Sequence, residues 1–426
     1  MAQIIAQVKE RGDEAVREYT VKFDGRAPEN LEISKKELKE AENSRAPELL
    51  DALRRAAENI ADFHRRQVQQ SWLETKKDGV ILGQRIRGLQ RVGLYVPGGK
   101  AVYPSSVIMN VVPAQAAGVE SLAIATPPSR NNADGLPDKT ILATCAILGV
   151  DEVYAVGGAQ AIAMFAYGAK GSEPQDGEIL CDPVDKITAR ATSSSPPPSA
   201  WSPASSASTP SPVRPKSPSS PTRVPTKLLA ADLIGQAEHD ELAGSVLITD
   251  SEDIADKVQE SLKYRVPRTE HAERVNTSLR GRQSGIILTD GIEQSIDAAN
   301  AYAAEHLEVQ TADPDAVIAK IRNAGAIFRG PYSPVPLGDY MSGSNHVLPT
   351  SGTARFAAGL GVHTFMKPVE VIEYDEQGLK TLAARVNAFA VSEDLPAHGE
   401  CVLSRFIDDP YNKATIKEQE EQAGLR

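Results

Sequence analysis

Residues 338–356, GDYMSGSNHVLPTSGTARF, concentrate side chains that could bind a metal ion or move protons. The segment has no apolar period typical of a helix or a strand, and it carries Asp339 and His346. Pro336 and Pro349 on either side of its polar bend disfavour a helix, so we expect a loop that presents ligands. Composition alone leaves open the alternative of a solvated turn.

Two other segments carry residues suited to chemistry. Gln236 and His239 stand at i and i+3 near the end of a predicted helix, KLLAADLIGQAEHDE, and therefore share one face. Glu305 and His306 form an adjacent acid–imidazole pair just before the strand pattern HLEVQ. Neighbouring residues in a loop can both face one pocket and divide proton transfer, and imidazole titrates near working pH. The structural alternatives are a surface histidine on the helix and a glutamate that caps a turn.

Four segments together resemble the histidinol dehydrogenases, and GDYMSGSNHVLPT is long enough to make chance agreement implausible. The four are QAEH at 236–239, AAEHLEVQ at 303–310, the segment at 338–356 and EDLPAH at 393–398. The resemblance extends from about residue 10 to residue 405, and only the Ser- and Pro-rich residues 189–226 interrupt it.

The resemblance implies one catalytic zinc ion per subunit, bound by nitrogen and oxygen donors that leave positions open for substrate. The implied ligands, which also bind substrate in the family, are Gln236, His239, Asp339 and His398. His306 is implied as the general base for the substrate hydroxyl and as a substrate contact, and Glu305 as the residue that activates water. Glu393 is implied as a further substrate contact. We assign His346 a loop-stabilising role in preference to metal ligation.

The evidence for a cofactor is thinner, because no GxGxxG fingerprint follows a strand. GLYVPGG at 93–99 and AVGGAQAIA at 155–163 each predict a strand that runs into a glycine turn. Glycines there let the backbone approach a phosphate, and a following helix offers its N-terminal N–H groups. The resemblance adds that Tyr95 and Gln160 contact NAD.

The implied activity is oxidation of L-histidinol to L-histidine through the aldehyde, in two hydride transfers to two NAD⁺, the last step of histidine biosynthesis. A homodimer is expected, in which the segment with Glu393 and His398 reaches the partner subunit's site. One alternative is a related dehydrogenase that acts on another small amino or sulfonated alcohol. A second is an inactive pair of α/β binding modules, joined by a Pro-rich tether that docks SH3-like domains.

The composition narrows the class of protein. A chain of 426 residues with 41% hydrophobic residues is long enough for a large core and two to four domains. A net charge of −11 argues against nucleic acid or an anionic membrane as partner. No apolar run approaches the roughly 20 residues that span a bilayer. The scattered Cys145, Cys181 and Cys401 suit a reducing cytoplasm and exclude a cysteine-based zinc site.

Short apolar runs that alternate with helical stretches predict an α/β fold of two tandem Rossmann-like parallel-sheet domains with helical N- and C-terminal extensions. We place a helical region at 1–90, the two domains at 91–226 and 227–374, and a helical segment at 375–426. Expected strands are RVGLYVP, SLAIATP and EVYAVGG in the first domain and GSVLITD, SGIILTD, HLEVQ and GAIFRG in the second.

Residues 191–226 break this pattern, because 22 of these 36 residues are Ser or Pro, a composition unsuited to strands or a core. A disordered linker is the usual interpretation. We infer instead that residues 189–226 are translated out of frame. The family expects GPGN where residues 189–192 are ARAT. The bases GGC CCG GGC AAC encode GPGN, and the same bases read one position later and followed by A encode ARAT.

The same shift applied to residues 206–226 allows VGIDTIAGPSEVTIVADEGAD, in which GPSE is a family motif. The shift removes the family's NAD-contacting Asn, whose position holds Thr192, and its substrate-contacting Ser, whose position holds Pro215. It also removes strand-forming apolar residues. We therefore predict that the present chain is unstable or inactive, and that the in-frame version is the working enzyme.

Overall fold

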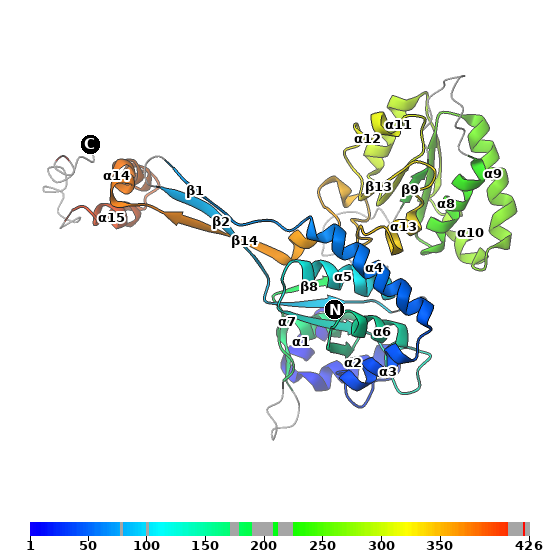
Figure 1. Cartoon of the computed structure of the whole chain (residues 1–426), viewed down its shortest axis with the longest axis horizontal. Helices are drawn as coiled ribbons and strands as arrows, with labels where there is room; N and C mark the ends of the chain where they lie inside the picture. The colour runs from blue at the N-terminus through cyan, green and yellow to red at the C-terminus, as the bar shows by residue number, and fades with distance from the viewer. Residues whose placement is uncertain are drawn as a thin grey trace. The chain divides into compact units, whose positions relative to one another are not determined.

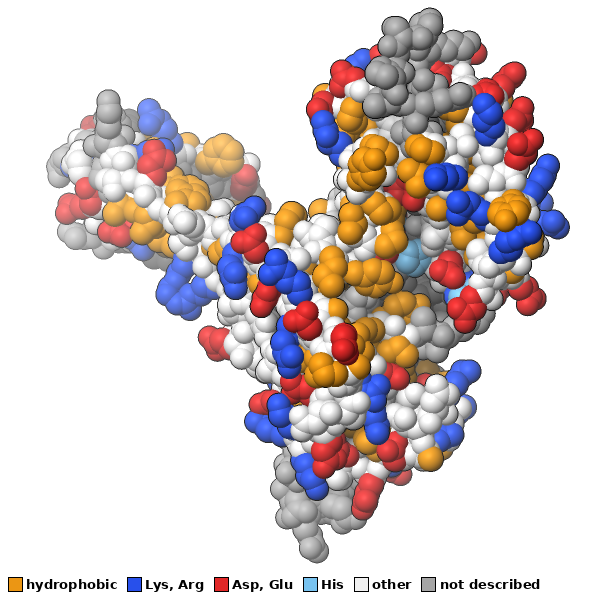
Figure 2. Space-filling view, turned by 45° about the vertical axis from the view of Figure 1, so that its right-hand side comes forward, with side chains coloured by type: hydrophobic (Ala, Val, Ile, Leu, Met, Phe, Trp, Pro, Cys, Tyr) orange, Lys and Arg blue, Asp and Glu red, His pale blue; other side chains and the backbone are white. Residues whose placement is uncertain are grey.

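The computed structural model describes residues 1–76, 80–98, 102–170, 179–189, 208–211, 225–407 and 421 (Figure 1). Contacts divide the chain into two compact units. The first unit comprises Met1–Val68 and Gly88–Phe365, and the second comprises Gln69–Arg87 and Met366–Arg426. No helix among the described residues is long and apolar enough to cross a membrane. On the face shown in Figure 2, Lys and Arg side chains are interspersed with Asp and Glu.

Four helices open the first unit: α1 (Ala2–Arg11), α2 (Asp13–Asp24), α3 (Lys35–Asn43) and α4 (Pro47–Arg65). Helix α3 begins with a capping box, in which Ser34 Oγ accepts from the Glu37 backbone N–H and the Glu37 carboxylate accepts from that of Ser34. Pro47 occupies the first turn of α4, where its missing N–H costs nothing. The helices predicted before residue 70 are confirmed. Strands occupy Trp72–Thr75 and Ile81–Gly88, however, within the region to residue 90 that we predicted to be helical.

The first sheet has four parallel strands in the order β5-β4-β3-β8. They are β3 (Arg91–Tyr95), β4 (Ser121–Thr126), β5 (Glu152–Ala155) and β8 (Lys186–Ala189), with helices α5 (Pro104–Ala116), α6 (Lys139–Ile147) and α7 (Gly158–Tyr167) in the connections. Arg91 donates to Ser121 at 2.6 Å and to Glu152 at 2.7 Å, which ties the starts of three neighbouring strands together. The strand order reverses between β3 and β8, and open parallel sheets bind ligands at such a switch point.

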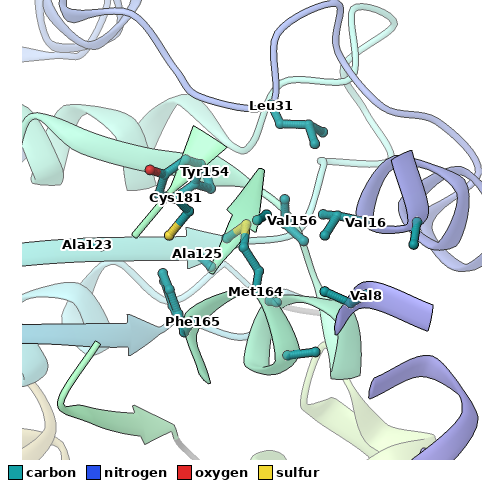
Figure 3. Packing of buried hydrophobic residues seen from close by; sticks show 14 residues of the cluster. Val8, Val16, Leu31, Ala123, Ala125, Tyr154, Val156, Met164, Phe165 and Cys181 are labelled. Carbon is teal, nitrogen blue, oxygen red and sulfur yellow. The ribbon is translucent and has the colours of Figure 1, made fainter. Parts of the chain in front are cut away.

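Helices α1 and α2 pack on α7 and cover one side of this sheet. Val8 and Val16 lie with Met164 and Phe165 in a buried cluster, and Figure 3 shows all four side chains in one layer of packing. Gly93 on β3 leaves room for the Phe165 ring, because a Cβ there would lie 2.6 Å from Phe165 Cδ2. The close approach of α7 to the sheet therefore depends on a missing side chain.

A second set of parallel strands follows. Strand β10 (Gly244–Thr249) pairs on one side with β9 (Ser208–Ser211) and on the other with β11 (Gly285–Leu288), while β12 (His306–Val309) pairs with β13 (Ala326–Arg329). Strand β12 also lies beside β9. The accompanying helices are α8 (Thr226–Glu238), α9 (Glu252–Arg265), α10 (Ala272–Arg280), α11 (Ile292–Tyr302) and α12 (Pro314–Ile318). A short antiparallel pair, β6 (Ala169–Lys170) and β7 (Ile179–Cys181), completes the strands of this unit.

These observations confirm an α/β fold with parallel sheets and every strand that we predicted from an apolar run. The two α/β regions fall into one compact unit with the N-terminal helices, so two separate tandem domains are not shown. The expectation that residues 191–226 form no strand is wrong at β9, which pairs in parallel with β10 over four residues. Most of the remaining residues between 190 and 224 lie outside the described part of the chain.

The second unit combines a sheet with helices. Strands β1 (Trp72–Thr75), β2 (Ile81–Gly88) and β14 (Met366–Glu373) lie in the order β1-β2-β14, followed by α14 (Glu376–Ser392) and α15 (Pro396–Leu403). The two helices pack together, and Ala383, Leu403 and Ile407 form their buried centre. This confirms helices within the predicted C-terminal segment as far as Leu403.

We expect Gly93→Ala to lower the free energy of unfolding by about 1–3 kcal/mol, because the new methyl group must displace Phe165 or the β3 backbone. Urea denaturation followed by circular dichroism measures the change. Gly285→Ala is the matched control, since a methyl group added to this strand glycine would meet no described atom within 4 Å. Equal stability of the two variants would contradict the packing argument.

Candidate active site

Helix α8 supplies the first two candidate residues. Its apolar face, with Leu229 and Leu233, packs in a buried cluster with strand β10 and helix α9. Gln236 lies in the last turn and is buried, whereas His239 directly follows the helix and keeps about a third of its side chain exposed. The sequence prediction that both residues belong to the end of one helix is confirmed.

Strand β12 brings an imidazole to Gln236. Because side chains alternate along a strand, Leu307 and Val309 enter an apolar cluster while His306 faces the other way. His306 Nδ1 lies 3.3 Å from Gln236 Oε1. A carbonyl oxygen only accepts, so the neutral ring carries its proton on Nδ1 and keeps the lone pair of Nε2 for another proton. Glu305 is buried immediately before the strand.

Helix α13 (Val335–Tyr340) supplies Asp339, which is a correction to the predicted loop. Gly338 and Asp339 are helical, and Pro336 does not prevent this, because a proline in the first turn breaks no helical hydrogen bond. Asp339 Oδ2 lies 3.6 Å from His239 Nε2. Gly338 fits closely against Phe328, whose ring packs edge-on against the His306 ring with 5.9 Å between centroids.

His346 holds the polar loop that follows α13. Its Nδ1 donates to the Asp339 carbonyl oxygen at 3.1 Å, so its Nε2 accepts from the Ser106 hydroxyl at 3.3 Å. Asn345 adds a bond of 2.7 Å from Nδ2 to the Met109 carbonyl. These contacts bind the loop to α5 and agree with the loop-stabilising role that we assigned to His346.

Three of the four predicted zinc ligands lie in the first unit, and two of them, His239 and Asp339, lie close together. Two ligands of a tetrahedral zinc stand about 3.3 Å apart, given bonds of about 2.0–2.1 Å, and the approach of His239 to Asp339 at 3.6 Å is close to that spacing. Gln236 lies one helical turn before His239 on α8, and its side chain contacts His306. The donor set of one imidazole, one carboxylate and one amide oxygen suits zinc.

The site also lacks two of its predicted members within this unit. Glu393 follows α14 and His398 lies on α15, both in the second unit, so their place at the site stays a prediction. Within the described residues, no group of three or more His, Cys, Asp and Glu side chains is arranged to hold a metal ion.

The two predicted NAD contacts, Tyr95 and Gln160, lie close together at the carboxyl ends of strands β3 and β5 of the first sheet. The Tyr95 hydroxyl, at the end of β3, accepts from the Gly158 N–H at 3.0 Å, and burial raises the pKa of Tyr95. Gly158 has φ of 59°, a conformation that favours glycine. Gln160 is fully buried, and neither atom of its amide has a hydrogen-bond partner among the described residues. Leaving such groups unpaired costs about 1–3 kcal/mol, so the turn fits a polar ligand that would bind them.

Sequence reasoning missed several polar residues behind these groups. Asp24 of α2 lies against Gly157, and burial raises the pKa of its carboxyl to about 6. Asp232, Glu308 and Gln310 form a hydrogen-bonded group beneath Gln236 and His306. The one available signal was spacing, since Asp232 precedes Gln236 by one helical turn and Glu308 follows His306 by one strand repeat.

Comparison with known proteins identifies what the chain is similar to. The family model described as histidinol dehydrogenase matches residues 1–189 and 222–406. A histidinol dehydrogenase of Bifidobacterium longum is 67% identical over 99% of this chain and 90% of its own length, and one of Mycobacterium tuberculosis (strain H37Rv) is 47% identical over 95% and 90%. The crystal structure of histidinol dehydrogenase from Elizabethkingia anophelis superimposes with a TM-score of 0.83 at 28% identity, over 95% of this chain and 90% of that one.

The match to the family model has one internal break. It ends at residue 189 and resumes at residue 222, so the unmatched residues 190–221 lie within the segment that we infer to be out of frame. The last matched residue before the break is also the last residue of β8, beside the switch point of the first sheet.

Proposed function

Because the chain belongs to the histidinol dehydrogenase family, we propose that it is built to oxidise L-histidinol to L-histidine through the aldehyde, with two NAD⁺ per turnover. This is the last step of histidine biosynthesis. The observation that carries the proposal is the meeting of His306 with Gln236, and of His239 with Asp339, from three separate elements. The residues thus brought together come from three of the four segments that resemble the family.

Zinc would be held by Gln236, His239, Asp339 and His398. When bound, it supplies a charge that holds the imidazole and amine of histidinol in a fixed orientation. Tyr95 and Gln160 bind NAD beside the switch point of the first sheet, and the unpartnered Gln160 amide supports this assignment. Glu393 contacts the substrate.

The protein side chains manage the protons of both oxidations. In the first, the carbinol carbon gives up a hydride to NAD⁺ and the substrate hydroxyl passes its proton to His306 Nε2, which leaves the aldehyde. Glu305 then removes a proton from the water that adds to the aldehyde carbon, His306 returns its proton to the aldehyde oxygen, and the product is the hydrate. In the second oxidation the hydrate loses a hydride to a second NAD⁺ and its hydroxyl proton to the base. Burial of Glu305 and His306 keeps bulk water away from these transfers.

We place this activity in a cytoplasmic homodimer. Cys145, Cys181 and Cys401 are all free thiols, as expected in a reducing compartment. The second unit carries Glu393 and His398, and a dimer in which this unit completes the partner's site accounts for donors from two units of the chain.

A frame error accounts for residues 189–226. The in-frame sequence places IDTI at β9, where the present chain has STPS. Strand β9 pairs with β10 at the edge of its sheet and lies beside β12, and Pro210 leaves this strand without one of its N–H donors. The break in the family match and the placement of Pro210 in this strand both support the proposal.

A chain with the in-frame residues 189–226, called the restored chain below, should produce NADH from L-histidinol and NAD⁺, and the present chain should not. Stopped assays with purified proteins of both forms measure this, and sequencing of the gene shows whether the shift is a true mutation. NAD binding and normal turnover by the present chain would contradict the frame proposal. No NADH from histidinol by the restored chain would instead contradict the proposed substrate.

Replacement of His239 by Asn in the restored chain should remove zinc and turnover together, because the imidazole donor is lost. Atomic absorption of the dialysed protein measures the metal. His271→Asn is the control, since His271 is an exposed histidine of the same unit and should leave the zinc content unchanged. Full zinc retention by His239→Asn would exclude His239 as a ligand.

Glu305→Gln should slow oxidation of the aldehyde by about 10²–10⁴-fold and slow oxidation of histidinol much less, because only the former needs an activated water. Separate assays with histidinol and histidinal as substrates distinguish the two half-reactions. Glu238→Gln, an exposed change on α8, serves as the control. Equal losses in both half-reactions would show that Glu305 has no separate role.

A further inference from the structure

A ladder of buried polar contacts joins α8 to β12. On α8, Asp232 and Gln236 stand one turn apart, and on β12 and just beyond it His306, Glu308 and Gln310 face the same side. The first rung is the contact between Gln236 and His306 at 3.3 Å. In the second rung, Gln310 Nε2 donates to Asp232 Oδ2 at 3.1 Å and to Glu308 Oε2 at 2.8 Å.

Glu308 also binds the start of α13. Its Oε1 accepts from the Val335 backbone N–H at 3.3 Å, and Asp339 follows Val335 by one helical turn. The side chain of Glu308 is almost fully buried. The Glu308 carboxyl group therefore joins β12 to α13 directly, and it is linked to Asp232 of α8 through Gln310.

The two carboxyl groups of the second rung both accept from Gln310 Nε2, which brings them next to each other. Two neighbouring carboxylates repel each other, and one proton between them removes the repulsion and supplies a donor. Burial raises the pKa of Glu308 and that of Asp232, and the charge of Asp232 raises the pKa of Glu308 further. The pair is therefore expected to carry one negative charge at neutral pH.

The surroundings of the pair provide no compensating cation in the described part of the chain. Besides the pair, the titratable groups along α8 and β12 are the exposed Lys227 and Glu238 and the residues His239, Glu305 and His306, and α13 contributes Asp339 and Tyr340. On the neighbouring strand β13, the residue opposite Glu308 is Phe328, and Arg329 pairs with Asp315 instead. A shared proton is then what permits two acids to be buried at this place.

We propose that Asp232 and Glu308 share one proton and act as positioning residues, which hold α8, β12 and α13 in the register that brings Gln236, His306 and Asp339 together. The pair does not touch substrate. The link to catalysis rests on the proposed function, whereas the shared proton and its structural role do not.

The shared proton has a defined effect on stability. An acid whose pKa is raised in the folded state keeps a proton that the unfolded chain releases. Its stabilising contribution is complete below the unfolded pKa, near 4.5 for Glu308, and is lost as pH rises through the folded value of about 8. Glu308→Gln replaces the shared proton with an amide that donates to Asp232 at every pH.

Thermal unfolding of the present chain and the restored chain between about pH 5 and pH 9 tests the proposal. In the unmodified protein the midpoint temperature of unfolding should fall as the pH rises toward 9. It should fall less in Glu308→Gln, and it should be lower at every pH in Glu308→Ala. An infrared difference spectrum at neutral pH should show a protonated carboxyl band that Glu308→Gln lacks. The control is Glu293→Gln, an exposed carboxylate paired with Lys320, which should follow the unmodified protein.

Steady-state kinetics of the restored chain test whether the pair affects catalysis. Glu308→Ala should lower kcat at least tenfold, and Glu308→Gln should recover most of that loss and flatten the alkaline limb of the pH profile. The proposal would be overturned if the unfolding midpoints of the unmodified protein and of Glu308→Gln changed equally with pH. It would also be overturned if Glu308→Gln and Glu308→Ala lowered kcat equally. Absence of histidinol turnover in every variant would refute the proposed function alone, because the unfolding and infrared results would still decide the shared proton.

Discussion

The apposition of α8 and β12 is the constraint on which the candidate site depends. Both elements place polar side chains in a buried layer, where hydrogen bonds to one another offset the free-energy cost of burial. The contact between Gln236 and His306 is therefore more than a meeting of two candidate residues, since it fixes which ring nitrogen of His306 is left for chemistry. Asp339 depends on the same layer through α13.

The same arrangement explains why strand β9 matters beyond its own four residues. It lies between β10, which supports α8 through the Leu233 and Leu247 cluster, and β12, which carries His306. The segment Ser208–Ser211 thus lies next to the strand that supports α8 and next to the strand that carries His306.

Most of the architecture followed from pattern. Runs such as SLAIAT and GSVLIT are apolar at nearly every position because both faces of a parallel sheet are buried. This pattern predicts a strand without knowledge of its neighbours, and the strands lie where they were predicted. The helix at Asp339 was missed because Pro336 resembles a helix breaker, although its place in the first turn is one that helices tolerate. Strand β9 was missed because its Ser and Pro composition does not resemble a strand.

The residues of the candidate site also divide into those that the sequence predicted and those that it did not. Gln236, His239, His306 and Asp339 were found through motifs whose meaning came from resemblance, while their separation in sequence hides their contact. Asp232 and Glu308 carry no motif, and each looks like an ordinary charged residue in the sequence. They are 76 positions apart, yet in the fold both accept from the same amide nitrogen of Gln310. Buried acids of this kind are visible only in three dimensions.

The second unit is discontinuous, with β1 and β2 near the start of the chain and β14, α14 and α15 near its end. During synthesis at about 5–20 residues per second, β1 and β2 leave the ribosome roughly tens of seconds before β14 exists to pair with them. Trp72 and Leu73 on β1 keep about half or more of their surface exposed even in the finished unit. A nascent hairpin with such residues and an open edge is a target for chaperones and for other chains. The helix that carries His398 is made after the elements that carry the other three predicted ligands, so a newborn chain cannot hold a metal ion with all four before α15 is synthesised.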